Sequence, residues 1–197
     1  MNKANFFDAE VAEHRAVVLA TAERLREPFQ RALDLWVTAI RQGGKLLFFG
    51  NGGSAGDAQH LATELSVRYK RDRIALAALA LTTDSSALTA CGNDLGFERV
   101  FERQIEALGR RGDVAVGIST SGQSENVCRA LERARFQGLA TVGLTGGSGG
   151  RVKELSDVAL IVPSTVTARI QEMHIMLGQM LCAGLEIALG LVADERT

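Results

Sequence analysis

Five short apolar runs recur along the chain, each bounded by glycine or polar turns and separated by helical sequence. They occupy residues 46–49, 75–81, 114–118, 140–144 and 158–162. Runs of this length that are apolar throughout are typical of strands buried on both faces. Strands that alternate with helices form a parallel sheet that helices cover on both sides, with right-handed crossovers. The sequence therefore predicts an α/β fold built on a five-stranded parallel sheet.

Three helical segments lie outside this alternation. Two extra N-terminal helices precede the first strand, at about residues 4–25 and 28–41, and Pro28 suits the first turn of the second. A long apolar C-terminal helix at about residues 167–192 follows the last strand and invites packing between subunits. Because no repeat or long linker interrupts the chain, we expect one domain over residues 1–197. Its parts are the N-terminal helices at 1–42, the sheet core at 43–165 and the C-terminal helix at 166–193.

The composition argues against several classes of partner and location. The net charge is −1 with 23% charged residues, so we expect no nucleic-acid-binding surface and no basic membrane patch. The three cysteines lack metal or disulfide spacing, and the first five residues start no signal-peptide core. We therefore expect a cytoplasmic protein with reduced thiols.

One apolar segment tests the expectation that no part of the chain spans a membrane. Residues 173–193 are apolar except for His174, Gln179 and Glu186, over nearly the length of a membrane span. Placing Glu186 and Gln179 inside a bilayer would cost several kcal/mol. A helix that is apolar on all sides can equally be buried in a core or between subunits, and we favour that interpretation.

The first strand breaks into Gly50-Asn51-Gly52-Gly53-Ser54 and is followed at once by helical sequence. A buried strand that ends in glycines at a helix start exposes backbone N–H groups, which makes an anion site. With Ala55 the stretch matches the G-x-G-x-x-A form of the dinucleotide fingerprint. That motif also needs an acidic residue at the end of the second strand. Asp72 lies before that strand and Asp84 lies too far along, so the fingerprint is incomplete.

A second polar loop, Ser119-Thr120-Ser121-Gly122-Gln123-Ser124, follows the third strand and opens a helix. In an open α/β sheet, ligands bind at the carboxyl ends of the strands where the strand order reverses. The loops after the first and third strands are natural neighbours there. Hydroxyls together with helix N–H groups suit a monophosphate ester, and the alternative is ordinary capping and turn chemistry. We favour the phosphate.

Further polar residues stand near these loops. His60 and Glu64 have the i, i+4 spacing that can bind a metal or exchange protons, although the same spacing is common in surface contacts. Asn93-Asp94 offers polar groups for sugar hydroxyls or forms an Asx turn. On the last helix, Gln171 and His174 share a face, and they either reach a cleft or belong to a solvated helix start.

Assembled in this order, these pieces resemble the sugar isomerase (SIS) domain family, and within it the bacterial phosphoheptose isomerases, over about residues 30 to 190. The motifs that carry the resemblance are Gly50-Asn51-Gly52-Gly53-Ser54, Asp57-Ala58-Gln59-His60, Gly92-Asn93-Asp94, Gly117-Ile118-Ser119-Thr120-Ser121-Gly122, Leu144-Thr145-Gly146 and Ala168-Arg169-Ile170-Gln171-Glu172-Met173-His174. The resemblance implies a flavodoxin-like doubly wound SIS fold. It also implies an aldose–ketose isomerase that converts sedoheptulose 7-phosphate to D-glycero-manno-heptose 7-phosphate through an enediol, for heptose and lipopolysaccharide biosynthesis.

The resemblance further implies a set of site residues in a homotetramer with shared active sites and one zinc ion per subunit. The phosphate would be held by Ser119, Thr120, Ser121 and Ser124. The sugar would contact Asn51, Gly52, Gly53, Ser54, Glu64, Asn93, Asp94 and Gln171. The metal ligands would be His60, Glu64, Gln171 and the residue at position 179. Glu64 would act as the proton-transfer base, with His60 and position 179 completing the catalytic set.

The chain departs from the family at Gln179, where the family has a histidine that serves as metal ligand and second acid–base group. A glutamine offers a carbonyl oxygen but exchanges no protons near neutral pH, and it is a weaker partner for zinc than imidazole. Gln179 is compatible with a natural variation, an introduced inactivating change or an altered function. The second catalytic role could then fall to water or to His174, and we expect a correct substrate pocket with weak turnover.

Two other functions compete with the isomerase. A non-catalytic SIS module would bind a sugar phosphate, or bind the bacterial replication initiator as a tetramer; Gln179 favours it, whereas Glu64 and Gln171 speak against it. A nicotinamide-dependent dehydrogenase is a more distant alternative, because its fingerprint is incomplete.

Overall fold

The structure, a computed structural model, describes residues 3–194. Its centre is a five-stranded parallel sheet in the order β2-β1-β3-β4-β5, the flavodoxin-like doubly wound order that was expected. The strands are β1 (Leu46–Gly50), β2 (Ala78–Ala80), β3 (Val114–Ile118), β4 (Ala140–Gly146) and β5 (Val158–Val162). The expected domain also includes residues 1–2 and 195–197, which lie outside the described residues.

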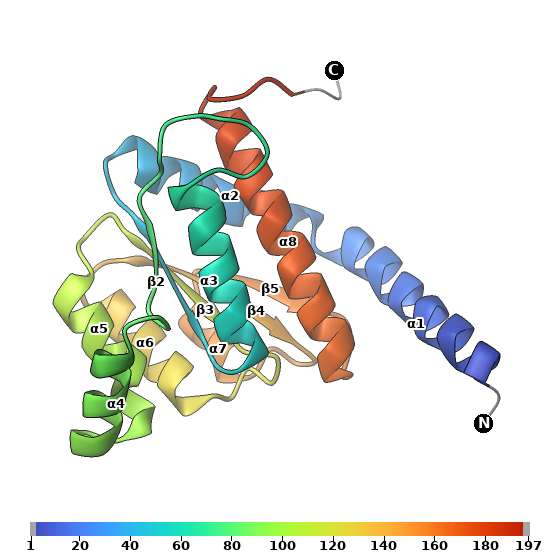
Figure 1. Cartoon of the computed structure of the whole chain (residues 1–197), viewed down its shortest axis with the longest axis horizontal. Coiled ribbons are helices and arrows are strands. Elements are labelled where there is room, and N and C mark those ends of the chain that lie inside the picture. Colours follow the sequence, from blue (N-terminus) through green and yellow to red (C-terminus); the bar gives the residue numbers. More distant parts are fainter. Residues whose placement is uncertain (1–2, 195–197) are drawn as a thin grey trace.

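Helices cover both faces of this sheet (Figure 1). They are α1 (Lys3–Arg24), α2 (Arg26–Arg41), α3 (Gly53–Ser66), α4 (Ser85–Asp94), the 3-10 turn η1 (Phe97–Arg99), α5 (Val100–Leu108), α6 (Glu125–Phe136), α7 (Gly150–Leu155) and α8 (Thr167–Ala188). Side chains of a strand alternate between faces, so β1 sends Leu46 and Phe48 into one apolar core and Leu47 and Phe49 into the other. The first core lies under α2, α3 and α8, and the second lies under α5, α6 and α7.

The expected strands differ from the observed ones mainly at the sheet edge. β3 and β5 have the expected bounds, and β4 runs two residues further, to Gly146. β2 is much shorter than the apolar run at 75–81, because it is an edge strand that pairs with β1 over three residues only. The amide of Leu76 bonds to the carbonyl of Leu65 at the end of α3, so this part of the run is held by a helix instead of a ladder.

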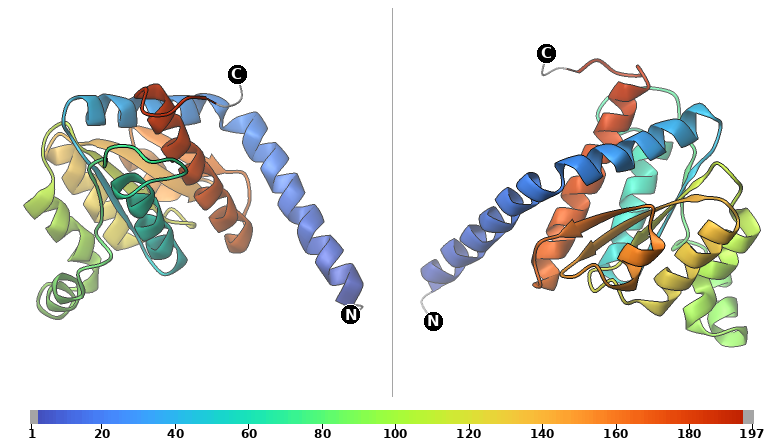
Figure 2. Two further views of the ribbon diagram at one scale, coloured as in Figure 1. Left: turned by 45° about the horizontal axis from the view of Figure 1, so that its top comes forward. Right: turned by 180° about the vertical axis from the view of Figure 1, so that it is seen from behind.

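The last helix is buried along most of its length. α8 ends at Ala188, four residues earlier than expected, and its buried positions include Met173, Leu177 and Leu181. Across residues 3–194, no helix combines the length and the apolar content that a membrane crossing requires. α1 extends away from the sheet (Figure 2), and its inner side contacts the start of α8 through Glu10 and Arg169.

Candidate active site

The glycine loop after β1 packs tightly against the neighbouring strand. A Cβ on Gly50 would lie 2.7 Å from the carbonyl oxygen of Ile118, so only glycine fits there. Gly52 has a φ of 57°, a conformation that favours glycine, and it stands at the N-cap of α3 with no side-chain cap. Ser54 is buried beneath the loop. The start of α3 is therefore open to an anion or a polar ligand.

The loop after β3 gathers three hydroxyl groups. The Oγ atom of Ser119 lies 3.0 Å from that of Ser124 and 3.5 Å from that of Ser121. Ser124 holds the N-cap position of α6, but its side chain does not cap the helix. Among the described residues, turn chemistry accounts for a backbone bond from Gly122 to the carbonyl of Ser119 and for the amide of Gln123 donating to Ser121 Oγ. Half-buried Thr120 lies between these serines. Hydroxyls that turn away from capping leave the positive end of α6 free for a phosphate.

The two loops are joined by a pair of amide side chains. Asn51 Nδ2 donates to Asn126 Oδ1 at 2.8 Å, and Asn126 Nδ2 donates back to Asn51 Oδ1 at 2.9 Å. This link exists because β1 and β3 are adjacent in the sheet, as the strand-order argument predicted. Sequence reasoning missed Asn126. The one available signal is an amide on the same apolar face of α6 as Val127 and Ala130.

A second group of polar side chains lies where α3 packs on α8. The helices approach closely, since a Cβ on Gly178 would lie 2.6 Å from Leu61. His60 Nε2 lies 3.2 Å from Glu64 Oε1 on the same helix and 3.2 Å from the side-chain nitrogen of Gln179 on α8. The structure thus brings together His60, Glu64 and Gln179, three of the four expected metal ligands.

The fourth expected ligand, Gln171, lies at the other end of the helix pair. Its side-chain amide packs directly on Gly53, where a Cβ would overlap it. Gly53 and His60 are seven residues apart, about 10 Å along the helix axis. Gln171 is therefore placed beside the glycine loop and not beside His60 in this arrangement of the side chains.

Asn93 and Asp94 lie at the end of α4, which packs chiefly on η1 and α5. Asn93 Nδ2 donates to Asp94 Oδ1 at 2.7 Å, so the two side chains bond to each other. Asp94 borders a cavity of about 480 Å³ between α4 and α5. Among the residues described, the lining of this cavity includes no other expected site residue.

The chemistry of the His60 cluster fits a cation. The Nε2 atom of His60 has a carboxylate oxygen on one side and an amide nitrogen on the other, and one ring nitrogen cannot both donate to the first and accept from the second. Turning the Gln179 amide by 180° presents its oxygen instead. Zinc ligands about 2.0–2.1 Å from the ion in a tetrahedral site lie roughly 3.3 Å from each other, close to the two separations seen here.

The same cluster is short of strong ligands. Among the described residues, no group of three or more histidine, cysteine, aspartate or glutamate side chains is arranged to hold a metal ion. His60 and Glu64 supply two such ligands, and Gln179 adds only an amide, which binds zinc more weakly than imidazole. The donor set of the cluster therefore contains fewer strong zinc ligands than a set with a second histidine would.

Asp57 lies one turn before His60 on α3 and was not assigned a role from the sequence. Burial raises the pKa of Asp57 to about 6, and the neighbouring His60 acts in the opposite direction. Its Oδ2 atom is buried and has no hydrogen-bond partner among the described residues. The helix that carries His60 and Glu64 therefore also carries a carboxyl group that is partly protonated just below neutral pH.

The sequence left open whether His174 reaches a cleft or lies at a solvated helix start. The structure places it in neither position. Its side chain is fully buried, and Nε2 lies 3.1 Å from the carbonyl oxygen of Thr145. Burial lowers the pKa of His174 to about 4, and the contact with Thr145 only partly offsets this effect. A neutral, enclosed imidazole is poorly placed to replace the acid–base group absent at position 179.

His174 should make the protein sensitive to acid. Because the folded-state pKa is about 4 and an unfolded histidine has a pKa near 6.5, the unfolded chain takes up the proton first as the pH falls. We expect the free energy of unfolding to fall between pH 6.5 and 4, by on the order of 2 kcal/mol from pH 7 to pH 5. His174→Gln should flatten this slope in urea titrations at fixed protein concentration.

His14→Gln, which removes a half-exposed imidazole, is the comparison variant, and the slope of His174→Gln should be flatter than that of this variant. Asp57 acts in the opposite direction, since a raised carboxyl pKa stabilises the fold as the pH falls through it. Asp57 is present in the wild type and in both variants, so the differences between their pH slopes isolate the contribution of His174. Equal slopes for the wild type and His174→Gln would contradict the assignment.

Comparison with known proteins gives a consistent picture. A family model described as SIS domain matches residues 11–146. The chain is 58% identical to the phosphoheptose isomerase of Paramagnetospirillum magneticum over 186 residues, which cover 94% of this chain and 97% of that protein. It is 52% identical to the phosphoheptose isomerase of a Nitratiruptor species, over 89% of this chain and 94% of that protein.

Solved structures agree with this relationship. The structure of the phosphoheptose isomerase GmhA from Neisseria gonorrhoeae is similar to this fold with a TM-score of 0.89 and 44% sequence identity, covering 93% of this chain and 98% of that one. A phosphoheptose isomerase structure from Francisella tularensis matches with a TM-score of 0.92 and 35% identity, covering 95% of this chain and 100% of that one.

Proposed function

Since this chain belongs to the SIS domain family and, within it, to the phosphoheptose isomerases, we propose that it converts sedoheptulose 7-phosphate to D-glycero-manno-heptose 7-phosphate. This reaction would serve heptose and lipopolysaccharide biosynthesis. The observation that carries the proposal is the placement of His60 and Glu64, in contact at 3.2 Å, on the helix that begins at the glycine loop. One helix thus joins an anion-binding start to an acid–base pair.

The substrate phosphate would bind at the start of α6. The gathered hydroxyls of Ser119, Ser121 and Ser124 support this placement, together with the positive end of the helix. Thr120 would complete the phosphate site. The sugar chain would extend over the glycine loop, with polar contacts from Asn51, Gly52, Gly53, Ser54 and Gln171. Asn93 and Asp94 belong to the same expected set, but Asp94 borders a different cavity, between α4 and α5. The packing of Gln171 on Gly53 supports its share of this role.

Glu64 would carry the proton transfer. Its carboxylate would remove the proton from C1 of the ketose and return it to C2 through an enediol, while water would carry the hydroxyl proton from the C1 oxygen to the C2 oxygen. His60, whose Nε2 faces the Glu64 carboxylate, would hold that carboxylate in place and hydrogen-bond a substrate oxygen. Gln179 can hydrogen-bond an oxygen but cannot move a proton near neutral pH. We therefore expect substrate binding to be intact and turnover to be slow.

A zinc ion would be held by His60, Glu64 and Gln179, with Gln171 as a further ligand if its side chain turns away from Gly53. The donor chemistry and the separations in the cluster support this role. When bound, zinc would polarise the substrate carbonyl and stabilise negative charge on its oxygen.

We further propose a cytoplasmic homotetramer with shared active sites. α1 extends from the body of the protein and exposes Phe6, Phe7, Val11 and Leu19. Apolar side chains gathered in this way mark surfaces that bind other chains. The groove between α1, α2 and α8 is also lined mainly by apolar side chains, among them Phe29 and Met176.

The direct test is to incubate the protein and zinc with sedoheptulose 7-phosphate and to follow the aldose product by chromatography. We expect slow conversion. Sedoheptulose without its phosphate is the matched control, and it should not react, because the serine loop would have nothing to hold. The proposal fails if no aldose forms at high enzyme concentration and long times, or if both sugars react equally.

A further inference from the structure

Arg73 lies beyond the end of α3, in the segment that leads to β2, and its side chain is only 1% exposed. Nη2 donates to the carbonyl oxygen of Glu64 at 2.7 Å, and Nη1 donates to that of Val67 at 3.1 Å. The last carbonyls of a helix have no partner within it and form the negative end of its dipole. The guanidinium therefore closes the end of α3 at the residue that carries the proposed base.

The partner of Arg73 stands on α8. Glu186 is 2% exposed and accepts a bond from Arg73 Nε at 2.7 Å, and it lies 3.4 Å from the amide nitrogen of Tyr69. Glu186 comes seven residues after Gln179, about two helical turns, so both project from the same face of α8. The ion pair ties the backbone of Glu64 to the face of α8 that presents Gln179.

We propose that Arg73, held by Glu186, is a positioning residue for Glu64. It fixes how far α3 lies along α8 and so sets the place of the Glu64 carboxylate relative to His60 and Gln179. This inference rests on the proposed isomerase function. Stability alone does not account for the pair, since a buried ion pair is often no more stabilising than apolar side chains of similar volume. A planar fork of donors does fix direction, which an apolar contact cannot.

The test removes the ion pair while filling its space. The double variant Arg73→Met/Glu186→Leu leaves no unpaired charge, so it should still fold, with a melting temperature lowered by the lost bonds to the carbonyls of Glu64 and Val67. We expect its kcat to fall by about 10- to 100-fold while its KM changes by less than about threefold, because small displacements of a catalytic group act mainly on the chemical step. Arg73→Lys keeps the charge but loses the fork, and its kcat should lie between the two.

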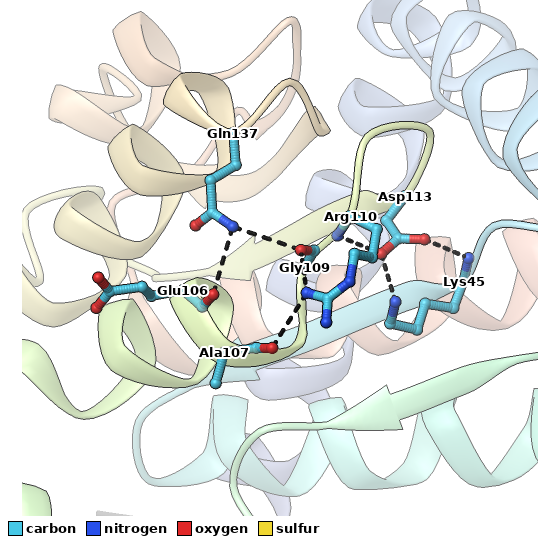
Figure 3. Close-up of polar contacts among 7 residues, drawn as sticks. All are labelled: Lys45, Glu106, Ala107, Gly109, Arg110, Asp113 and Gln137. Atoms are coloured by element: carbon cyan, nitrogen blue, oxygen red, sulfur yellow. Dashed lines mark hydrogen bonds and ion pairs between the residues drawn. The ribbon is translucent and has the colours of Figure 1, made fainter.

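The matched control is a second ion pair that contacts neither Glu64 nor α8, Lys45 with Asp113 (Figure 3). Lys45 directly precedes β1 and Asp113 directly precedes β3, at the ends of the strands remote from the glycine and serine loops. Lys45→Met/Asp113→Asn removes this pair and keeps an oxygen for the amide of Lys45, which Asp113 also binds. It should lower the melting temperature without changing kcat.

The outcomes separate the positioning role from a structural one. A folded Arg73→Met/Glu186→Leu protein with wild-type kcat would overturn the proposal, as would an equal loss of kcat in the control pair. If the wild type itself does not convert the substrate, the proposed function fails. The positioning is then read from hydrogen exchange of the amides at 63–67, which must be faster in the Arg73 variant than in the control. Unchanged exchange there would overturn it.

Discussion

Gln179→His is expected to raise kcat for sedoheptulose 7-phosphate by about 10²- to 10⁴-fold, the usual contribution of one acid–base group. Gln179 touches His60 across the α3–α8 contact, so an imidazole at this position would stand beside the Glu64 carboxylate. It would supply the proton exchange that an amide cannot, and it would give the cluster a second strong zinc ligand. KM should change little, since the phosphate loop is untouched.

The measurement compares steady-state kinetics and zinc affinity for the wild type and the variant. Gln59→His is the matched control: it adds an imidazole to exposed α3 surface next to His60. That variant should match the wild type in both properties. If Gln179→His binds zinc more tightly but turns over no faster, the residue is only a metal ligand. If neither property changes, position 179 has no part in the chemistry.

Most of the fold could be predicted because buried strands carry their own signal. Each of the five apolar runs coincides with or overlaps a strand, and the adjacency of β1 and β3 followed from the rule that loops meet where the strand order reverses. The length of the edge strand β2 was overestimated, because an apolar run does not indicate how many of its residues have a partner strand beside them. The amide of Leu76 bonds to the end of α3, a contact set by tertiary packing alone.

The candidate site divides in the same way. The glycine loop, the serine loop and the His60–Glu64 pair are local patterns and were visible in the sequence. Asn126 and Arg73 were not, because their partners lie far along the chain: 75 residues separate Asn126 from Asn51, and 113 separate Arg73 from Glu186. Their types alone, an amide and an arginine among many, carry no sign of these contacts.

Glu64→Gln is expected to lower kcat by at least about 10²-fold and to abolish exchange of the transferred hydrogen with solvent. Glutamine keeps the size of Glu64 and can still contact His60, but it takes up no proton at neutral pH. Gln179 lacks acid–base capacity and His60 faces the carboxylate, so we expect Glu64 to be the group that removes the proton. Mass spectrometry of product formed in deuterated water measures the exchange directly.

Combining the two substitutions gives the sharper result. If Glu64 and an imidazole at position 179 act as one unit, Gln179→His should not raise kcat in the Glu64→Gln background. The effects of groups that work together on kcat are not additive, because each group needs the other. Glu132→Gln, on α6, is the control for removing a carboxylate and should leave both kcat and exchange unchanged. Undiminished exchange in Glu64→Gln would show that another group removes the proton. A full gain from Gln179→His in that background would show that the new imidazole works without Glu64.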